Sequence, residues 1–142
     1  MNKIKQYLFL SLYIFLQCTW GILQTLAGLA LLIRHRSCPH HFFMGAVHTC
    51  WNRPDGISLG LFIFTQKDCR EMTVHEYGHT WQSLILGPFY LPVIGLPSLL
   101  WCRLPFFRQL RQEKALPYSA FFTERWADRL GSTLTAVGSH FK

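Results

Sequence analysis

A His-Glu-x-x-His pattern is the clearest chemical feature of the sequence, at His75, Glu76 and His79. It lies in an apolar stretch that has the character of a helix. Residues four apart lie on one face of a helix, so the two imidazoles can bind the same metal ion, with Glu76 at the rim of that face. This arrangement supplies two ligands and a general base for a hydrolytic zinc site. The alternative is an apolar helix that buries two histidines and a glutamate without an evident partner.

Two neighbours of the motif add to this prediction. Gly78 carries no side chain, which lets another element pack closely beneath the predicted site. Gln82 lies about one turn beyond His79 and faces the same way, so we expect it to bind substrate or a ligand.

A second pair of candidate residues lies downstream, where Glu124 and Asp128 are four apart in another predicted helix. They belong to a total of only seven carboxylates. A carboxylate in apolar, aromatic-rich sequence needs a partner or a metal, which makes this helical face a candidate part of the site. The alternative is a solvated face on which the carboxylates lie beside Arg125 and Arg129.

These features together resemble the gluzincins, the thermolysin-like branch of the zincin metallopeptidases. The resemblance rests on His75, Glu76, His79, Glu124 and Asp128. It implies that Zn²⁺ is held by His75, His79 and Glu124, and that Asp128 orients a metal-bound histidine. It also implies that Glu76 is the general base and that the substrate is a peptide or protein.

The resemblance covers two short segments, Glu71–Leu86 and Tyr118–Leu130. The wider stretch from Gly78 to Ser98 is similar to a set of small bacterial membrane proteins, which implies a family but no particular activity. Gluzincins also use an aromatic or histidine side chain to assist at the oxyanion. The candidates for that role are Tyr118, which is also a possible substrate-binding residue, and His140.

The remaining histidines and the cysteines follow no recognised ligand spacing. The cysteines are odd in number, without a C-x-x-C pair, and indicate neither a disulfide framework nor a thiolate zinc site. A disulfide from Cys50 to Cys38 or to Cys69 is the alternative for an extracytoplasmic protein. Four histidines between residues 35 and 48 are expected to be solvated, and metal binding by this cluster is the alternative. The cysteines are Cys18, Cys38, Cys50, Cys69 and Cys102, and these histidines are His35, His40, His41 and His48.

Composition indicates contact with a membrane. Half of the 142 residues are hydrophobic and only 15% are charged, whereas a soluble domain has about 25% charged residues. The net charge of +7 is compatible with nucleic acid or with anionic lipid. Because the basic residues flank apolar segments and form no basic helix, we expect a lipid bilayer as partner and no nucleic acid.

The N-terminal apolar run is long enough to cross that bilayer. Residues Tyr7–Ile33 contain no charge, and about 20 apolar residues span the hydrocarbon core. We therefore predict a transmembrane anchor at 1–36 and a membrane-seated domain at 37–142. Gln17 and Gln24 are seven apart in this run, so they either meet another helix on one face or are tolerated polar residues.

Two strands are predicted before the motif helix, at Phe42–Cys50 and Ile57–Thr65. The turn sequence Asn52–Gly56 between them, with Pro54 and Gly56, predicts a β-hairpin. It also resembles the second ligand motif of site-2-type intramembrane proteases, but it precedes the His-Glu-x-x-His helix here, so we interpret it as a turn. The edge of Ile57–Thr65 is a candidate for pairing with a peptide substrate, and simple core packing is the alternative.

Two further helices are predicted around a broken apolar segment. The motif helix begins near Cys69 or Arg70 and ends at Leu86, before Gly87-Pro88. The segment 88–101 is too short and too interrupted by proline and glycine for a comfortable span, and fits an interfacial or re-entrant position. The last helix runs from Tyr118 to Leu130, with Gly131 as its C-cap and a loose tail after it.

The predicted fold is a mainly α membrane protein with a small β-hairpin, in which an N-terminal transmembrane helix precedes a minimal zincin-like α+β domain. The predicted function is a membrane-anchored zinc metallopeptidase that cleaves peptide bonds through a zinc-activated water. A zinc-binding membrane scaffold without catalysis is the alternative.

Overall fold

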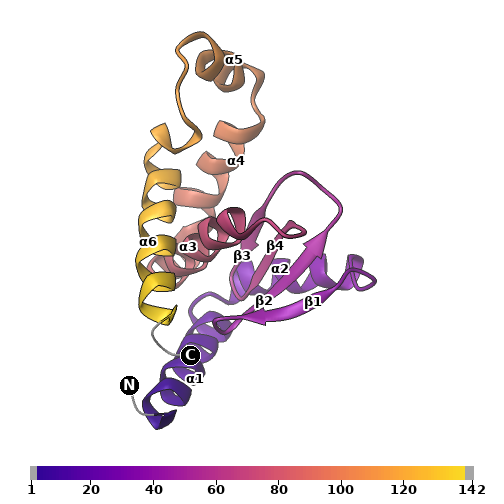
Figure 1. Ribbon diagram of the computed structural model, residues 1–142, viewed down its shortest axis with the longest axis vertical. Helices are drawn as coiled ribbons and strands as arrows, with labels where there is room; N and C mark the ends of the chain where they lie inside the picture. The colour runs from indigo at the N-terminus through magenta and orange to yellow at the C-terminus, as the bar shows by residue number, and fades with distance from the viewer. Residues whose placement is uncertain (1–2, 140–142) are drawn as a thin grey trace.

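The protein is mostly helical, with one small sheet of four strands (Figure 1). The computed structural model describes residues 3–139. The helices are α1 (Lys3–Thr19), α2 (Ile22–Arg34), α3 (Arg70–Leu86), α4 (Leu96–Arg103), α5 (Pro105–Glu113) and α6 (Phe122–Ser139). The strands are β1 (His40–Phe43), β2 (Ala46–Trp51), β3 (Ile57–Leu59) and β4 (Phe62–Gln66). Short helical turns are η1 (Gly87–Phe89), η2 (Leu91–Gly95) and η3 (Tyr118–Ala120). The prediction of a mainly α protein with a small β element is confirmed.

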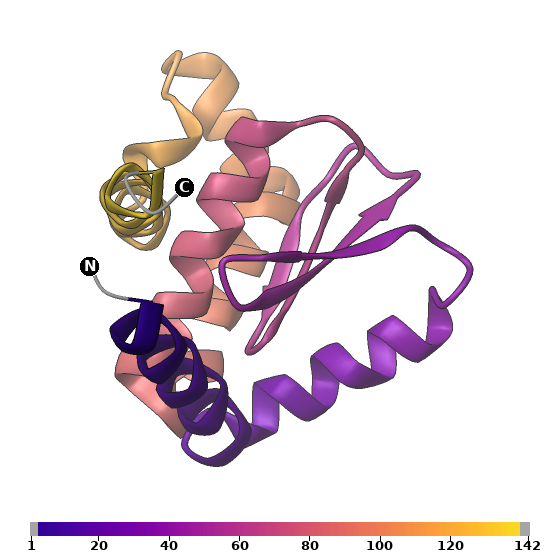
Figure 2. The same ribbon diagram turned by 60° about the horizontal axis from the view of Figure 1, so that its bottom comes forward.

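The sheet lies between two helical layers (Figure 2). Side chains alternate between the two faces of a strand, and β4 is buried on both. Phe62 and Phe64 pack in a cluster with Leu31 and Leu32 of α2, whereas Ile63 packs in a cluster with residues of α1 and α3. Helix α6 lies on the far side of α3, which places α3 in the middle of the molecule.

The predicted single hairpin is wrong, because each of its two predicted strands is itself a hairpin. Strand β1 pairs antiparallel with β2, and β3 pairs antiparallel with β4. Successive positive φ angles at Met44 and Gly45 turn the first hairpin within two residues, and Gly60 has a φ of 59° in the second. Such turns require the left-handed region. A methionine at the first position gives little sign of it in the sequence.

The segment Asn52–Gly56 is consequently a crossover connection and not a hairpin turn. Strands β2 and β4 are parallel neighbours, which gives the order β1-β2-β4-β3. Only β3 therefore lies at the sheet edge beside the connection, and β4 is interior. The candidate edge for a peptide shrinks from Ile57–Thr65 to Ile57–Leu59.

The N-terminal apolar run is not one continuous helix. Among residues 3–139 no helix is by itself long and apolar enough to cross a membrane; α1 and α2 meet the requirement only as a pair, bent by 92°. The prediction of one continuous N-terminal helix is therefore wrong, whereas the transmembrane anchor stays a prediction. The hydroxyl of Thr25 donates a hydrogen bond to the Gln17 carbonyl at 2.7 Å. It thereby satisfies a backbone group that the break at Gly21 leaves without a helical partner.

Buried glutamine amides join α3 to the bend between α1 and α2, which we call the elbow. The Gln17 amide donates to the Thr80 carbonyl at 2.8 Å, and the Gln24 amide donates to the Ser83 hydroxyl and the Gly87 carbonyl at 2.8 and 3.0 Å. Both glutamines are fully buried. Of the two interpretations of these residues, contact with another helix is confirmed. Residues 3–34 therefore pack on the predicted domain 37–142.

Helix α3 has the predicted limits, whereas α6 is longer than predicted. Cys69 precedes the first residue of α3 and Gly87, with a φ of 53°, follows its last. The prediction that Gly131 ends the last helix is wrong, since α6 continues to Ser139. A Cβ at Gly131 would overlap the carbonyl of Val74 in α3. This glycine is therefore needed for close helix packing and not for a cap.

Gly78 makes the matching contact from the other helix. A Cβ at this position would overlap the carbonyl of Ala127 in α6. The two glycines, one on each helix, let the backbones of α3 and α6 approach closely at two points. The expected role of Gly78 in close packing is confirmed.

The apolar segment after α3 folds as a run of short helical turns. η1, the π-helical turn η2 and α4 follow one another from Gly87 to Arg103, and α4 contacts α6. Helix α5 carries no buried residue and projects from the body of the molecule (Figure 1).

We predict that Gly78→Ala destabilises the protein by about 1–3 kcal/mol, because the added methyl group forces two backbones apart. Gly95→Ala is the matched control. A Cβ there meets its nearest neighbour, a Leu91 side-chain carbon, at 3.4 Å, and alanine in a helix gains up to about 1 kcal/mol over glycine. Urea unfolding measures both. Equal stability of Gly78→Ala and the unchanged protein would contradict the close helix contact.

Candidate metal centre

Three predicted ligands converge where α3 faces α6. The Nε2 atoms of His75 and His79 lie 3.1 and 3.4 Å from the same oxygen, Oε2 of Glu124. The Glu124 side chain is 1% exposed. The three ligand atoms all lie within 4.8 Å of one another, so this group could hold a metal ion.

These separations match those around a tetrahedral ion. Bonds of about 2.0–2.1 Å in tetrahedral geometry place neighbouring ligand atoms about 3.3 Å apart. The observed 3.1 and 3.4 Å fall on either side of this value. Two imidazole nitrogens and a carboxylate oxygen are also a donor set that divalent transition metals accept.

The other nitrogen of each histidine is held by an outer partner. Nδ1 of His75 lies 2.7 Å from Oδ1 of Asp128, and Nδ1 of His79 lies 2.7 Å from Oε1 of Gln82. A proton on each Nδ1 leaves Nε2 facing the other ligands, which is the arrangement that metal-binding histidines use. The structure brings Asp128 to the predicted position beside a ligand histidine.

Gln82 contacts a predicted ligand, His79, and its expected contact with substrate stays a prediction. Its side chain is fully buried. The amide oxygen accepts from His79, and the amide nitrogen donates to the Thr123 carbonyl at 2.8 Å. The Thr123 hydroxyl in turn donates to Oε1 of Glu124 at 3.1 Å. Gln82 and Thr123 thus link the two ligand helices, through one hydrogen bond at each polar atom of the Gln82 amide.

Glu76 lies beside the ligands with a carboxylate that is free to act. It is buried, and no residue between 3 and 139 donates a hydrogen bond to it. A Cβ at Gly56 would overlap its carboxylate, so the connection before β3 passes directly over it. Burial raises the pKa of Glu76, against the opposing effect of His79 and His75. A carboxylate with a raised pKa is better matched to proton transfer near neutral pH.

Charges inside the site perturb the ligands themselves. Burial opposes a charge on His75, but the carboxylates of Glu124, Glu76 and Asp128 together outweigh it and raise the His75 pKa to about 9. Burial likewise opposes a charge on Glu124, but hydrogen bonds from His75 and His79 outweigh it and lower its pKa. Without metal, an imidazolium at His75 therefore neutralises Glu124 at neutral pH.

Two tyrosines border the site. The Tyr118 ring lies 6.2 Å from the His75 ring and is partly exposed. The Arg111 guanidinium lies 5.4 Å from the Tyr118 ring centroid. Tyr90, which the sequence analysis missed, is buried and donates from its hydroxyl to the Ser58 carbonyl of β3 at 3.4 Å. The role of Tyr118 stays a prediction, and His140 lies outside the described residues.

Other residues that could not be assigned from the sequence lie away from this centre. His35 bonds to the Leu31 carbonyl, and His40 bonds to Thr49 and to the Arg36 carbonyl. All five cysteines are free thiols. Two contacts near the centre could not be predicted from the sequence. Gly56 lies over Glu76 because of the crossover connection, and Tyr90 reaches β3 because of the turns after α3.

Comparisons with models of protein families, with curated proteins and with solved structures find no match to this chain.

We predict that metal affinity rises with pH up to about pH 9 and then levels off, because a ligand histidine with a pKa of about 9 must lose its proton to bind. Each displaced proton makes affinity rise about tenfold per pH unit below that pKa. Chelator-buffered Zn²⁺ titrations from pH 6.5 upward measure this. Asp128→Asn, which removes one charge beside His75, should move the break to lower pH. An affinity independent of pH over this range would contradict the prediction.

Proposed function

We propose that the protein is a membrane-seated zinc metallopeptidase in which Zn²⁺ is held by His75, His79 and Glu124. The observation that carries the proposal is the convergence of both Nε2 atoms on one buried Glu124 oxygen. A second carboxylate, Glu76, lies beside them without a hydrogen-bonding partner among residues 3–139. Three ligands and a separate free carboxylate are the parts that a hydrolytic site needs.

The mixed donor set supports zinc. Two imidazoles and one carboxylate suit Zn²⁺, whereas Mg²⁺ and Ca²⁺ prefer oxygen ligands alone. When bound, zinc lowers the pKa of a water molecule toward about 7 and polarises the scissile carbonyl. Three protein ligands leave one position of a tetrahedral site for that chemistry.

Glu76 provides the proton transfer. Its carboxylate takes a proton from the attacking water and delivers it to the nitrogen of the leaving amine. The raised pKa of Glu76, caused by its burial, makes it a stronger base than a solvated glutamate. Asp128 and Gln82 keep the histidines in position throughout, through their contacts with Nδ1.

The segment at Gly56 that passes over Glu76 supports the proposal that the substrate is an extended peptide. Gly56 is partly exposed and has no side chain between its backbone and Glu76. It directly precedes β3, the edge strand, whose backbone could pair with a peptide. The Tyr90 hydroxyl donates a hydrogen bond to the Ser58 carbonyl of that edge. A peptide could therefore pair only with the end of β3 near Gly56. Tyr118, beside His75, is the candidate for binding the oxyanion.

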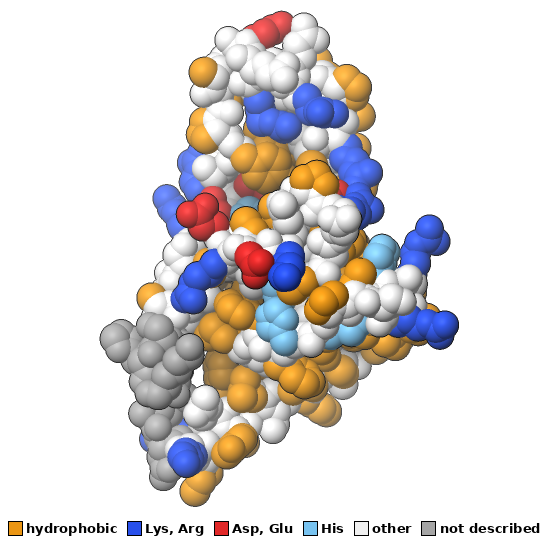
Figure 3. Space-filling model, turned by 45° about the vertical axis from the view of Figure 1, so that its right-hand side comes forward, with side chains coloured by type: hydrophobic (Ala, Val, Ile, Leu, Met, Phe, Trp, Pro, Cys, Tyr) orange, Lys and Arg blue, Asp and Glu red, His pale blue; other side chains and the backbone are white. Residues whose placement is uncertain are grey.

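The apolar surface of the N-terminal helices supports a seat on a lipid bilayer. Helix α2 exposes Leu23, Leu26 and Ile33, and α1 exposes Leu8 and Leu12. Hydrophobic side chains dominate the lower part of the surface in Figure 3, whereas Lys and Arg gather higher up. An apolar surface of this kind marks an interaction site on a soluble protein or a membrane contact. The low content of charged residues favours the membrane.

Burial of the site favours a second candidate, a zinc-stabilised scaffold without catalysis. Glu76 and His79 are each 6% exposed. Substrate must therefore reach the centre past His75, the most exposed of the three ligands. In this alternative, zinc would hold α3 to α6, and substrate would not reach its fourth position.

We predict that Glu76→Gln greatly slows peptide cleavage and keeps the zinc, because Glu76 is the base and not a ligand. General-base catalysis contributes about 10²–10⁴-fold to rate, which is the expected loss. Digestion of a peptide library and metal analysis of the same samples measure the two properties. Glu71→Gln is the control, since Glu71 is exposed in the first turn of the same helix. Full cleavage by Glu76→Gln would exclude the proposed base, and zinc binding without any cleavage by the unchanged protein would establish the scaffold.

We predict that the protein floats with lipid vesicles and that the double change Leu23→Asp and Leu26→Asp releases it. Both side chains are more than half exposed on α2, so the added charges would enter lipid at high cost. Ser132→Asp with Thr133→Asp adds the same charge on exposed positions of α6 and should leave flotation unchanged. Unchanged protein that stays in the aqueous fraction would argue against the membrane seat.

A further inference from the structure

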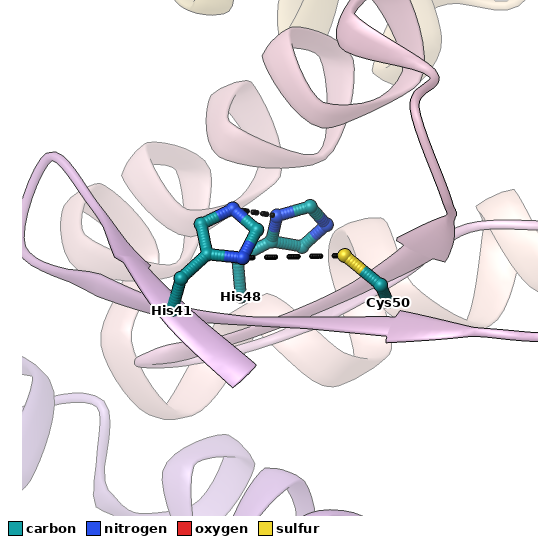
Figure 4. Close-up of side chains that lie close together, drawn as sticks. All are labelled: His41, His48 and Cys50. Carbon is teal, nitrogen blue, oxygen red and sulfur yellow. Dashed lines mark hydrogen bonds between the residues drawn. The ribbon is translucent and has the colours of Figure 1, made fainter. Parts of the chain in front are cut away.

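A second group of metal-binding side chains lies on the sheet, separate from the centre between α3 and α6. His41 comes from β1, and His48 and Cys50 come from β2 (Figure 4). One ligand atom from each residue lies within 4.8 Å of the other two. The sequence analysis expected these histidines to be solvated, but His48 is buried.

The strand register explains why these residues meet. His41 and His48 are direct partners across the antiparallel pair β1–β2. Cys50 follows His48 by two positions on the same strand, so both side chains lie on one face. Figure 4 shows the three side chains pointing toward one another. This placement depends on the tight turn at Met44–Gly45, which the sequence did not reveal.

The distances within the group fit a bound cation. Nε2 of His41 lies 2.9 Å from Nδ1 of His48, and Nδ1 of His41 lies 4.0 Å from the Cys50 sulfur. Ligand atoms around a tetrahedral ion with nitrogen and sulfur ligands are about 3.3–3.7 Å apart. The two distances involve different nitrogens of His41, and one imidazole binds a given ion through one nitrogen only. A rotation of His41, which is exposed, is therefore needed to bring that nitrogen into range of both partners.

The buried histidine of the group, His48, is oriented by a threonine hydroxyl on its far side. Nε2 of His48 lies 2.6 Å from the Thr65 hydroxyl. A proton on Nε2 donated to Thr65 leaves Nδ1 free to face His41 and Cys50, as in metal-binding histidines with an outer hydrogen-bond partner. The Thr65 hydroxyl lies 3.3 Å from the hydroxyl of Thr73 in α3. The second group is thus connected to the N-terminal turns of the helix that carries His75.

A cavity of about 270 Å³ borders the group. The loop before α3 contributes Asp68 and Cys69 to its wall. The cavity gives a metal ion access from solvent. It also provides room for a further ligand beyond the two imidazoles and the thiol.

We propose that His41, His48 and Cys50 form a second metal site, selective for a thiophilic cation such as Zn²⁺ or Cu⁺. A thiolate with two imidazoles favours these ions over Mg²⁺ and Ca²⁺. The bound ion would join β1 to β2 and fix the His48–Thr65 contact. This inference does not depend on the proposed peptidase activity, because the second site shares no ligand with the first.

Cobalt substitution of the full chain tests the site. Only a sulfur ligand gives a thiolate-to-cobalt charge-transfer band, and the His75–His79–Glu124 group contains no sulfur. We expect the band in the unchanged protein and in Glu124→Ala, which should lose one equivalent of cobalt. Cys50→Ser and His48→Ala should abolish the band, whereas Cys18→Ser and His40→Ala should keep it. An absent band in the unchanged protein, or a band that survives Cys50→Ser, would overturn the proposal.

Thiol alkylation provides a test without any substitution. Added Zn²⁺ or Cu⁺ should slow alkylation of Cys50 at least tenfold, read by peptide mass spectrometry, while exposed Cys18 serves as the internal reference. The cation that protects Cys50 at the lower free concentration identifies the preferred metal. Equal labelling of Cys50 with and without both cations would show a hydrogen-bonded cluster only and would overturn the proposal.

Discussion

The close contact of α3 with α6 is the constraint on which the candidate metal centre depends. His75 and His79 come from one helix and Glu124 from the other, so the ligand set exists only where the two backbones nearly touch. Gly78 and Gly131 permit that approach, because a Cβ at either would overlap a carbonyl of the opposite helix. The candidate centre thus depends on glycine at these two positions as well as on the ligand residues.

A buried polar network holds the central helix from its other side. Gln17 and Gln24 donate hydrogen bonds to backbone and hydroxyl groups near the C-terminal end of α3. Apolar contacts alone would let α3 shift along its axis relative to α1 and α2. Buried amides stabilise only when their partners are in register. The elbow between α1 and α2 therefore fixes the axial position of α3, and with it the height of the histidines relative to Glu124.

The features that depend on neighbouring residues could be predicted from the sequence. The limits of α3 follow from its apolar run and from Gly87, and the residues of the metal centre follow from two i, i+4 pairs on helices. The errors have non-local causes. Met44–Gly45 turns within two residues without the usual turn sequence, so the first hairpin has the pattern of one strand, and only Gly60 marks the turn of the second. The break at Gly21 depends on Thr25 reaching the Gln17 carbonyl. Gly131 looked like a cap because its partner, Val74, lies on another helix.

The contacts among the proposed ligands have a consequence for how their side chains are held in place. An imidazolium at His75 lies between Glu124 and Asp128, so its single positive charge offsets part of the negative charge of the two carboxylates. The side chains of the candidate metal centre are consequently held together by contacts among themselves. In the proposed centre, His75, His79 and Glu124 would not need a bound ion to bring them to one point.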